Sequence, residues 1–192
     1  MPHSHLQGGK VLRQLLDGNT RWVNAQPIRN LREATRTAEE LVQFQDPHAI
    51  IVTCSDSRVI PEFMFDANVG DLFVIRVAGN VINPDILASI EFACVVLRSS
   101  LVLVLGHQNC GAIAAKQRDD TGTILSKNMK SLLKKIEVKN NHNYLEAIAY
   151  NAEVQSKRII TESSIISDLV RHDKVVIKSA IYYMSSRLVE LN

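Results

Sequence analysis

Apolar residues follow two patterns along this chain, and each pattern indicates one kind of element. Short continuous apolar runs bounded by turn-forming residues are typical of buried strands, whereas apolar residues spaced three and four apart are typical of helices. The runs predict strands at 49–53, 72–77, 101–105 and 174–177, the last with a continuation to 183, and a short edge strand at 187–191. The spacing predicts helices at 9–24, 30–45, 84–98, 111–117 and 144–170, the last broken near 161–164.

The order of these elements indicates the fold class. Strands alternate with helices along most of the chain, and the strands are apolar on both faces, as strands of a helix-covered parallel sheet are. We therefore expect an α/β fold with a mostly parallel central sheet flanked by helices, in a single domain over residues 1–192. The first helix would form an N-terminal helical arm, residues 1–28.

Charge and composition narrow the classes of partner. The 192 residues carry a net charge of +2, which is too small to indicate nucleic acid or an anionic membrane as the main partner. The longest apolar runs are far shorter than the roughly 20 residues of a membrane-spanning helix. Residues 1–10 lack the apolar stretch of a secretion signal, so we expect a cytoplasmic protein. Its three cysteines then favour metal binding or packing over disulfides.

Two cysteines and a histidine stand at the ends of predicted strands. Cys54 directly follows the first strand, and His107 follows the third after a single glycine, with Cys110 three residues further on. Ligands of such sheets bind beyond the carboxyl ends of the strands, so these side chains should meet at one edge. Zinc accepts thiolate and imidazole ligands, and three protein ligands leave a fourth position for water, which is the catalytic arrangement. Each motif alone is weak, but the combination favours a metal site over core packing.

Asp56, Arg58 and the third cysteine, Cys94, can each be explained without a metal. Asp56 and Arg58 are two residues apart, so in a turn or extended segment they share a face. They could form an ordinary surface ion pair, or Arg58 could orient a carboxylate beside the metal. Cys94 lies inside a predicted helix between apolar neighbours and is expected to be a core residue.

Several motifs together resemble those of the β-class carbonic anhydrases. The family's C-x-D-x-R and H-x-x-C motifs stand here as CSDSR at 54–58 and HQNC at 107–110. The likeness continues in four further segments: LDGNTRW at 16–22, QDP at 45–47, GDLFVIRVAGN at 70–80 and SIEFA at 89–93. It covers roughly residues 11–182, and the motifs in combination are highly specific.

The resemblance implies roles for nine residues. Three would be the zinc ligands: Cys54, His107 and Cys110. Two would form the catalytic pair: Asp56 and Arg58. Four would contact the substrate or line its small apolar pocket: Gln45, Phe73, Ala78 and Phe92. Many members of the family carry tyrosine at the position of Phe92, so this chain lacks one pocket hydroxyl.

The resemblance also bears on assembly. The family buries its site at a dimer interface, with the glutamine and the aromatic position supplied by the partner chain. We therefore expect a homodimer or a higher even oligomer, with the arm at 1–28 contacting the partner. Arg187 stands where many members carry a turn glycine, so the C-terminal hairpin is the least certain part of the likeness.

The activity implied by the resemblance is the zinc-dependent, reversible hydration of carbon dioxide to bicarbonate and a proton. Two alternatives remain open from the sequence. Relatives of this fold hydrolyse carbonyl sulfide or carbon disulfide at the same metal site. A zinc-stabilised protein without turnover would carry the same three ligands.

Overall fold

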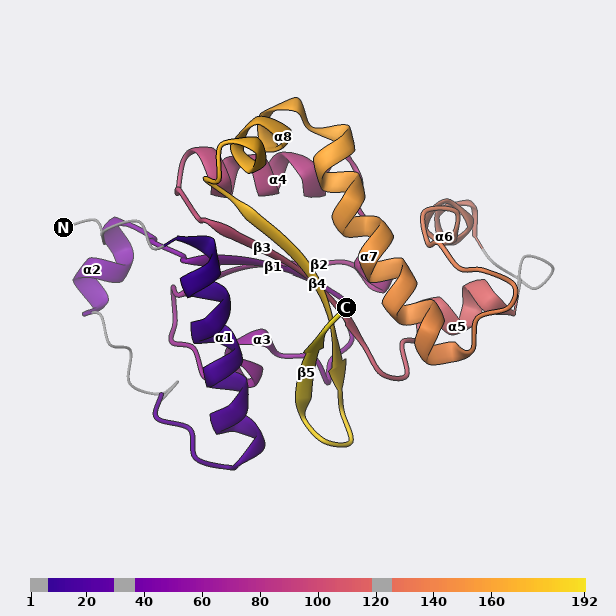
Figure 1. Cartoon of the computed structure of the whole chain (residues 1–192), viewed down its shortest axis with the longest axis horizontal. Coiled ribbons are helices and arrows are strands. Elements are labelled where there is room, and N and C mark those ends of the chain that lie inside the picture. The colour runs from indigo at the N-terminus through magenta and orange to yellow at the C-terminus, as the bar shows by residue number, and fades with distance from the viewer. Residues whose placement is uncertain (1–6, 30–36, 119–125) are drawn as a thin grey trace.

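Five strands form one sheet in the order β2–β1–β3–β4–β5 (Figure 1). In the computed structural model, which describes residues 7–29, 37–118 and 126–192, the strands are β1 (Ala49–Thr53), β2 (Leu72–Arg76), β3 (Leu101–His107), β4 (Val176–Tyr183) and β5 (Leu188–Leu191). The first four strands in the chain pair in parallel, and β5 returns antiparallel along β4. The expected α/β fold with a mostly parallel sheet is confirmed.

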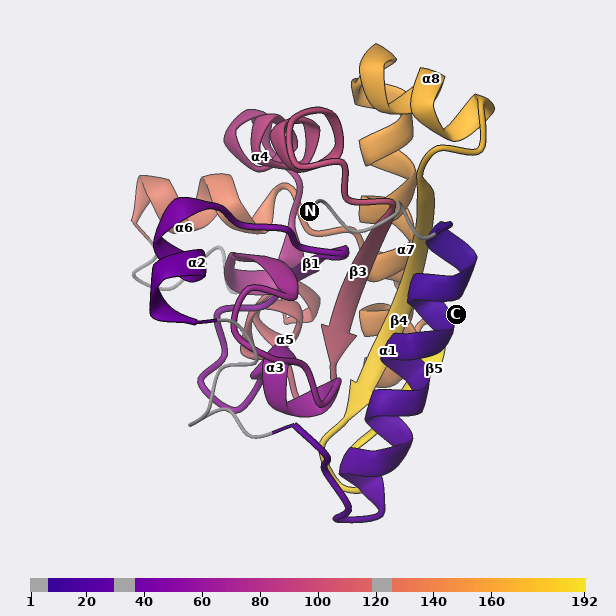
Figure 2. The ribbon, with the colours of Figure 1, turned by 90° about the vertical axis from the view of Figure 1, so that its left-hand side faces the viewer.

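Helices cover both faces of this sheet. The described helices are α1 (Gly8–Val23), α2 (Ala38–Gln43), α3 (Pro61–Met64), α4 (Pro84–Val95), α5 (Gly111–Gln117), α6 (Lys127–Leu133), α7 (Tyr144–Glu162) and α8 (Ser164–Arg171), with a 3₁₀ turn η1 (Ala78–Asn80). Helices α1 and α3 pack on one face, whereas α4, α7 and α8 pack on the other (Figures 1 and 2). Successive β1 residues such as Ile50 and Ile51 point to opposite cores and are fully buried, which explains the continuous apolar runs. None of the helices in the described ranges is long and apolar enough to cross a membrane.

Element ends differ from the sequence expectations in a few places. The helix expected at 30–45 is only partly within the described residues, where it covers Ala38–Gln43. A capping box between Thr37 and Glu40 forms its N-terminus. The break expected near 161–164 is confirmed at Ser163, whose side chain caps α8. Helix α4 ends at Val95, short of residue 98, and the chain turns through Arg98 with a φ of 61°.

The sequence predicted that this strand ends at residue 105, but β3 continues through Gly106 to His107. Gly106 pairs with Ile181 and His107 pairs with Tyr182, so the neighbouring β4 carries the ladder two residues further. A Cβ at Gly106 would lie 2.9 Å from the Ile148 side chain, so the glycine lets α7 pack closely on the strand. Glycine therefore marks close packing here and does not end the element.

Gly18 and Asn19, near the end of α1, are contact residues, although both have low helix propensity. Helix α1 continues through both of them to Val23. A Cβ at Gly18 would lie 1.9 Å from the Phe65 carbonyl oxygen. Asn19 is buried and donates to the carbonyl oxygens of Met64 at 3.0 Å and Arg187 at 2.9 Å. The same side chain thus joins α1 to α3 and to the C-terminal hairpin.

Candidate metal centre

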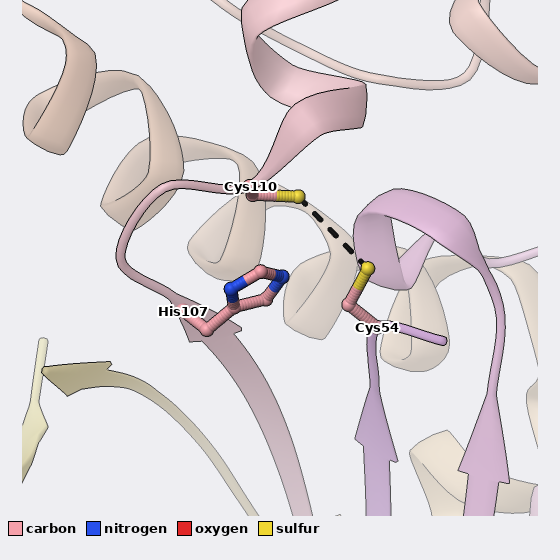
Figure 3. Close-up of side chains that lie close together, drawn as sticks. All are labelled: Cys54, His107 and Cys110. Carbon is pink, nitrogen blue, oxygen red and sulfur yellow. Dashed lines mark hydrogen bonds between the residues drawn. The ribbon is translucent and has the colours of Figure 1, made fainter. Parts of the chain in front are cut away.

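The three predicted metal ligands meet at the carboxyl edge of the sheet. Cys54 directly follows β1, His107 is the last residue of β3, and Cys110 is the N-cap of α5. The strands β1 and β3 are neighbours, and Thr53 pairs with Leu105, so the two chain segments leave the sheet side by side. Figure 3 shows the imidazole and the two thiols pointing toward a common centre. The juxtaposition expected from the sequence is therefore present.

The geometry of this group suits a metal ion. One ligand atom from each residue lies within 4.8 Å of the others, and all three residues are buried. Nδ1 of His107 lies 2.9 Å from the carbonyl oxygen of Gln108, which can only accept, so the ring proton resides on Nδ1. Nε2 is left buried without a hydrogen-bond partner. A buried nitrogen lone pair facing two thiols fits a cation, because otherwise its desolvation is uncompensated.

The two thiols differ in acidity although they are close together. The Cys110 thiol donates to Cys54 Sγ across 4.0 Å (Figure 3), and this contact is the main influence that lowers the pKa of Cys54. The same contact, together with burial, raises the pKa of Cys110. The N-terminus of a helix favours a thiolate, and Cys110 is the N-cap of α5. The structure instead favours Cys54 as the first thiolate, and a cation between the sulfurs would favour ionisation of both.

Asp56 and Arg58 form a paired group beside the ligands. The guanidinium of Arg58 donates to both carboxylate oxygens, through Nε at 2.9 Å and Nη2 at 2.7 Å. This pairing is the main cause that holds the pKa of Asp56 well below its ordinary value. Nη2 of Arg58 also donates to the carbonyl oxygen of Asn109, at 3.2 Å. The pair therefore connects the two ligand-bearing segments and is more than a local surface contact.

Arg76, at the end of β2, holds the backbone of the Cys54 segment in place. Its guanidinium donates to the carbonyl oxygens of Cys54 at 3.2 Å and Asp56 at 2.7 Å. Tyr144, which the sequence did not single out, donates from its hydroxyl to the Cys110 carbonyl oxygen at 2.5 Å. The sequence did not predict either contact, because each joins residues far apart in the chain.

The four predicted substrate residues occupy different environments. Ala78 begins η1, which contacts β1, β3 and α5. Phe73 pairs with Ile50 in the sheet, three residues before the end of β2, and packs on the core beneath α4 and α7. Gln45 and Phe92 are exposed in the single chain. Of these four, the structure places Ala78 nearest to the ligand-bearing elements, and the substrate role of all four stays a prediction.

One cavity among the described residues lies away from this centre. It has a volume of about 490 Å³ and is lined by α1, by residues 28–29 and by the loop before β2. His48 and Leu72, which also line it, mark the amino ends of β1 and β2, whereas the ligands lie at the carboxyl ends. The cavity is thus separate from the metal-type cluster.

Comparisons with known proteins agree with this geometry. Residues 49–189 match the family model described as carbonic anhydrase. A carbonic anhydrase of Mycolicibacterium smegmatis is 48% identical over 101 residues, which are 53% of this chain and 48% of the relative. A carbonic anhydrase of Synechocystis is 35% identical over 153 residues, covering 70% of this chain and 56% of the relative. The chain spans about half the length of several curated relatives that it matches.

Solved structures show the same fold. The β-carbonic anhydrase CcaA superimposes with a TM-score of 0.75 and 25% identity, covering 95% of this chain and 88% of that one. One of two tetrameric β-carbonic anhydrases from Sordaria macrospora gives a TM-score of 0.72 at 17% identity, covering 95% and 96%. The likeness therefore extends over almost the whole chain, including the helices outside the matched family segment.

Proposed function

Because the chain belongs to the β-class carbonic anhydrase family, we propose that it catalyses the reversible hydration of carbon dioxide, with Zn²⁺ held by Cys54, His107 and Cys110. The observation that carries the proposal is the buried cluster in which Nε2 of His107 has no hydrogen-bond partner and faces two thiols. Zinc prefers this set of sulfur and nitrogen donors, and three ligands keep one position open for chemistry.

The residues around the cluster can prepare the reaction. When bound, zinc supplies a Lewis acid that lowers the pKa of water and makes hydroxide available as the nucleophile. Asp56, fixed by the two hydrogen bonds from Arg58, would accept a hydrogen bond from that hydroxide and direct its lone pair toward carbon. Carbon dioxide is apolar, and the cluster adjoins apolar side chains of Val77, Val81 and Ala112. The products are bicarbonate and a proton, so the atoms of water and carbon dioxide are all accounted for.

We propose further that the working form is a homodimer or a higher even oligomer. Several apolar side chains are exposed in the single chain: Val42 (87%), Phe44 (48%), Phe92 (46%), Val95 (53%) and Val96 (59%). Exposed apolar side chains on this scale suit a subunit interface. The exposure of Gln45 and Phe92 agrees with a site completed across that interface, and the arm at 1–28 would contact the partner.

The position of α1 makes deletion of the arm an ambiguous test of assembly. Val11 and Leu15 pack into the core of their own chain, so removal of 1–28 would also expose that core. Phe92→Glu is sharper, because it places a charge on the exposed face of α4 without touching the core. Light scattering should show a loss of the oligomer in this variant. A wild-type protein that is fully active as a monomer would contradict the proposal.

Metal analysis joined to an activity assay tests the function. Wild-type protein should contain about one zinc per chain and hydrate carbon dioxide, while Cys54→Ser, His107→Ala and Cys110→Ser should lose both properties. Cys94→Ser is the matched control, because Cys94 is buried in a different core cluster and should keep both. A full zinc content in Cys54→Ser or Cys110→Ser would reject these ligands.

Substrate preference requires its own measurement. The assay should compare carbon dioxide with carbonyl sulfide and carbon disulfide at equal concentration, with faster turnover of carbon dioxide expected. Faster turnover of either sulfur compound would reassign the activity. A zinc-loaded protein inactive on all three would be a zinc-stabilised protein without turnover. The cytoplasmic location is likewise a prediction, which fractionation of cells would check.

A further inference from the structure

Two buried amide side chains on α7 form hydrogen bonds to the backbone in and just after the turn η1. Asn151 and Gln155 lie one helical turn apart, and neither is exposed. Nδ2 of Asn151 donates to the carbonyl oxygen of Gly79 at 2.9 Å, and Oε1 of Gln155 accepts from the Ile82 N–H at 2.8 Å. A hydrogen bond of 3.2 Å from Gln155 Nε2 to Asn151 Oδ1 joins the two side chains. The amides therefore hold the backbone within η1, at Gly79, and just after it, at Ile82.

Asn151 and Gln155 also hold a second segment, residues 135–137, which packs against η1. Oδ1 of Asn151 accepts from the Glu137 N–H at 3.0 Å, and Nε2 of Gln155 donates to the Lys135 carbonyl oxygen at 2.8 Å. Between these two anchors, Ile136 is fully buried against Gly79, where an added Cβ would lie 2.8 Å from its Cδ1. Gly79 has a φ of 71°, so both its conformation and its contact require glycine. Two separate backbone segments are thus fixed relative to one helix.

The turn held in this way contacts the three elements that position the metal ligands. These are β1, which Cys54 follows; β3, which ends at His107; and α5, whose N-cap is Cys110. The N–H of Val77, just before η1, donates to the Thr53 carbonyl oxygen at 3.0 Å, one residue before Cys54. Cys54, Cys110 and Ile136 also belong to one buried cluster.

We propose that Asn151, with Gln155, is a positioning residue of the metal site, holding η1 against Cys54 so that the three ligand atoms stay in the arrangement that binds the ion. This inference rests on the zinc site proposed above. Asn151 acts through its hydrogen bonds to the backbone of Gly79 and Glu137. Buried amides suit this task, because a side chain with two N–H donors and an oxygen acceptor can hydrogen-bond to two backbone segments that have no sheet partners. Outer-shell groups of this kind commonly change metal affinity by about 10- to 100-fold.

The test compares Asn151→Leu with a control on the same helix. Leucine keeps the branched shape and the number of heavy atoms of asparagine and removes the hydrogen bonds to Gly79 and Glu137. Arg158→Met is matched, because Arg158 also donates to the Lys135 carbonyl oxygen, at 3.0 Å, and pairs with Glu137 at 3.1 Å, without bonding to η1. Zinc affinity is measured by competition with a chelator, and the thiolate-to-metal absorption band is recorded after loading with Co²⁺.

We expect the zinc dissociation constant of Asn151→Leu to rise about tenfold or more and its Co²⁺ band to change, with Arg158→Met unchanged in both. A folded Asn151→Leu with wild-type affinity and spectrum would overturn the inference alone. Equal weakening in both variants would also overturn it, since the effect would then be a general loss of structure. Wild-type protein that binds no zinc would overturn the proposed function and this inference with it.

A measurement on the wild-type protein keeps the inference testable if Asn151→Leu does not fold. Cd²⁺ is larger than Zn²⁺, so exchanging the ions moves the ligating sulfurs. The side-chain amide resonances of Asn151 should shift on this exchange, because Asn151 contacts the turn beside Cys54. The side-chain amide resonances of Asn192 should not shift. Asn192 donates to the Ala149 carbonyl oxygen at 3.2 Å and has no hydrogen bond to η1 among those described. Unchanged Asn151 resonances would overturn the inference.

Discussion

Arg58 holds Asp56 by both carboxylate oxygens and at the same time donates to the Asn109 carbonyl oxygen. Asp56 follows the first ligand by two residues, and Asn109 precedes the last ligand by one. A single guanidinium therefore joins the two loops that carry the proposed zinc site. Its planar, forked set of donors makes this possible, and a lysine could not reproduce it.

Replacing Arg58 tests whether this link serves catalysis. Arg58→Ala should keep its zinc, because no ligand is changed, and should lose about 100-fold or more in carbon dioxide hydration because Asp56 is released from its position. Asp56→Asn should likewise keep zinc and lose activity. Arg171→Ala is the control, since Arg171 forms an exposed ion pair with Asp168 far along the chain. If Arg58→Ala kept wild-type turnover across the alkaline pH range, the Asp56–Arg58 pair would be only a surface ion pair without a catalytic role.

The buried thiol of Cys94 predicts a dependence of stability on alkaline pH. Burial raises the pKa of Cys94 from 9.0 to about 12. Because the folded pKa lies above the unfolded one, the thiol's contribution is complete below pH 9 and is lost as pH rises from 9 to 12. Cys94→Ala should therefore lose stability less steeply than wild type in this range, by at most about 1.4 kcal/mol per pH unit. Denaturant unfolding at several pH values measures the difference, and parallel curves would contradict the pKa shift.

The close approach of α1 to α3 predicts opposite effects for two glycines of one helix. Gly18→Ala should destabilise by about 1–3 kcal/mol or more, because its Cβ meets the Phe65 carbonyl oxygen. Gly9→Ala, with nothing within 4 Å of the new Cβ, should be neutral or stabilise by up to about 1 kcal/mol through helix propensity. Thermal unfolding of both variants is the measurement. A neutral Gly18→Ala would show that the helix can move away from α3 at little cost.

The C-terminal hairpin forms although Arg187 occupies the turn position at which the family often has glycine. Arg187 has a φ of 64°, which is costly for a residue with a Cβ, and its guanidinium lies 5.4 Å from the centre of the Trp22 ring. Arg187→Gly should change stability by less than about 1 kcal/mol, because relief of the backbone cost offsets the lost ring contact. Arg187→Ala loses the contact and keeps the cost, so it should be the less stable variant in urea unfolding. The reverse order would contradict this account.

The sequence alone determined the fold class and the juxtaposition of two cysteines and a histidine, because both depend on local signals. Continuous apolar runs mark strands buried on both faces, and the carboxyl ends of neighbouring parallel strands meet at one edge, which brings Cys54 and His107 together. The family motifs then supplied the roles of Asp56 and Arg58, and the structure shows the pair formed beside the ligands.

Tertiary structure decided what local propensity could not. Gly18 and Gly106 interrupt neither α1 nor β3, because each allows a neighbouring segment to approach the backbone, and that neighbour is distant in sequence. The order of ionisation of the two thiols depends on a 4.0 Å contact between residues 56 positions apart. Asn151 lies 72 positions from Gly79, on a helix whose spacing indicated only packing. Such long-range contacts exist only once the sheet and its helices have assembled, so no pattern within a short window of sequence predicts them.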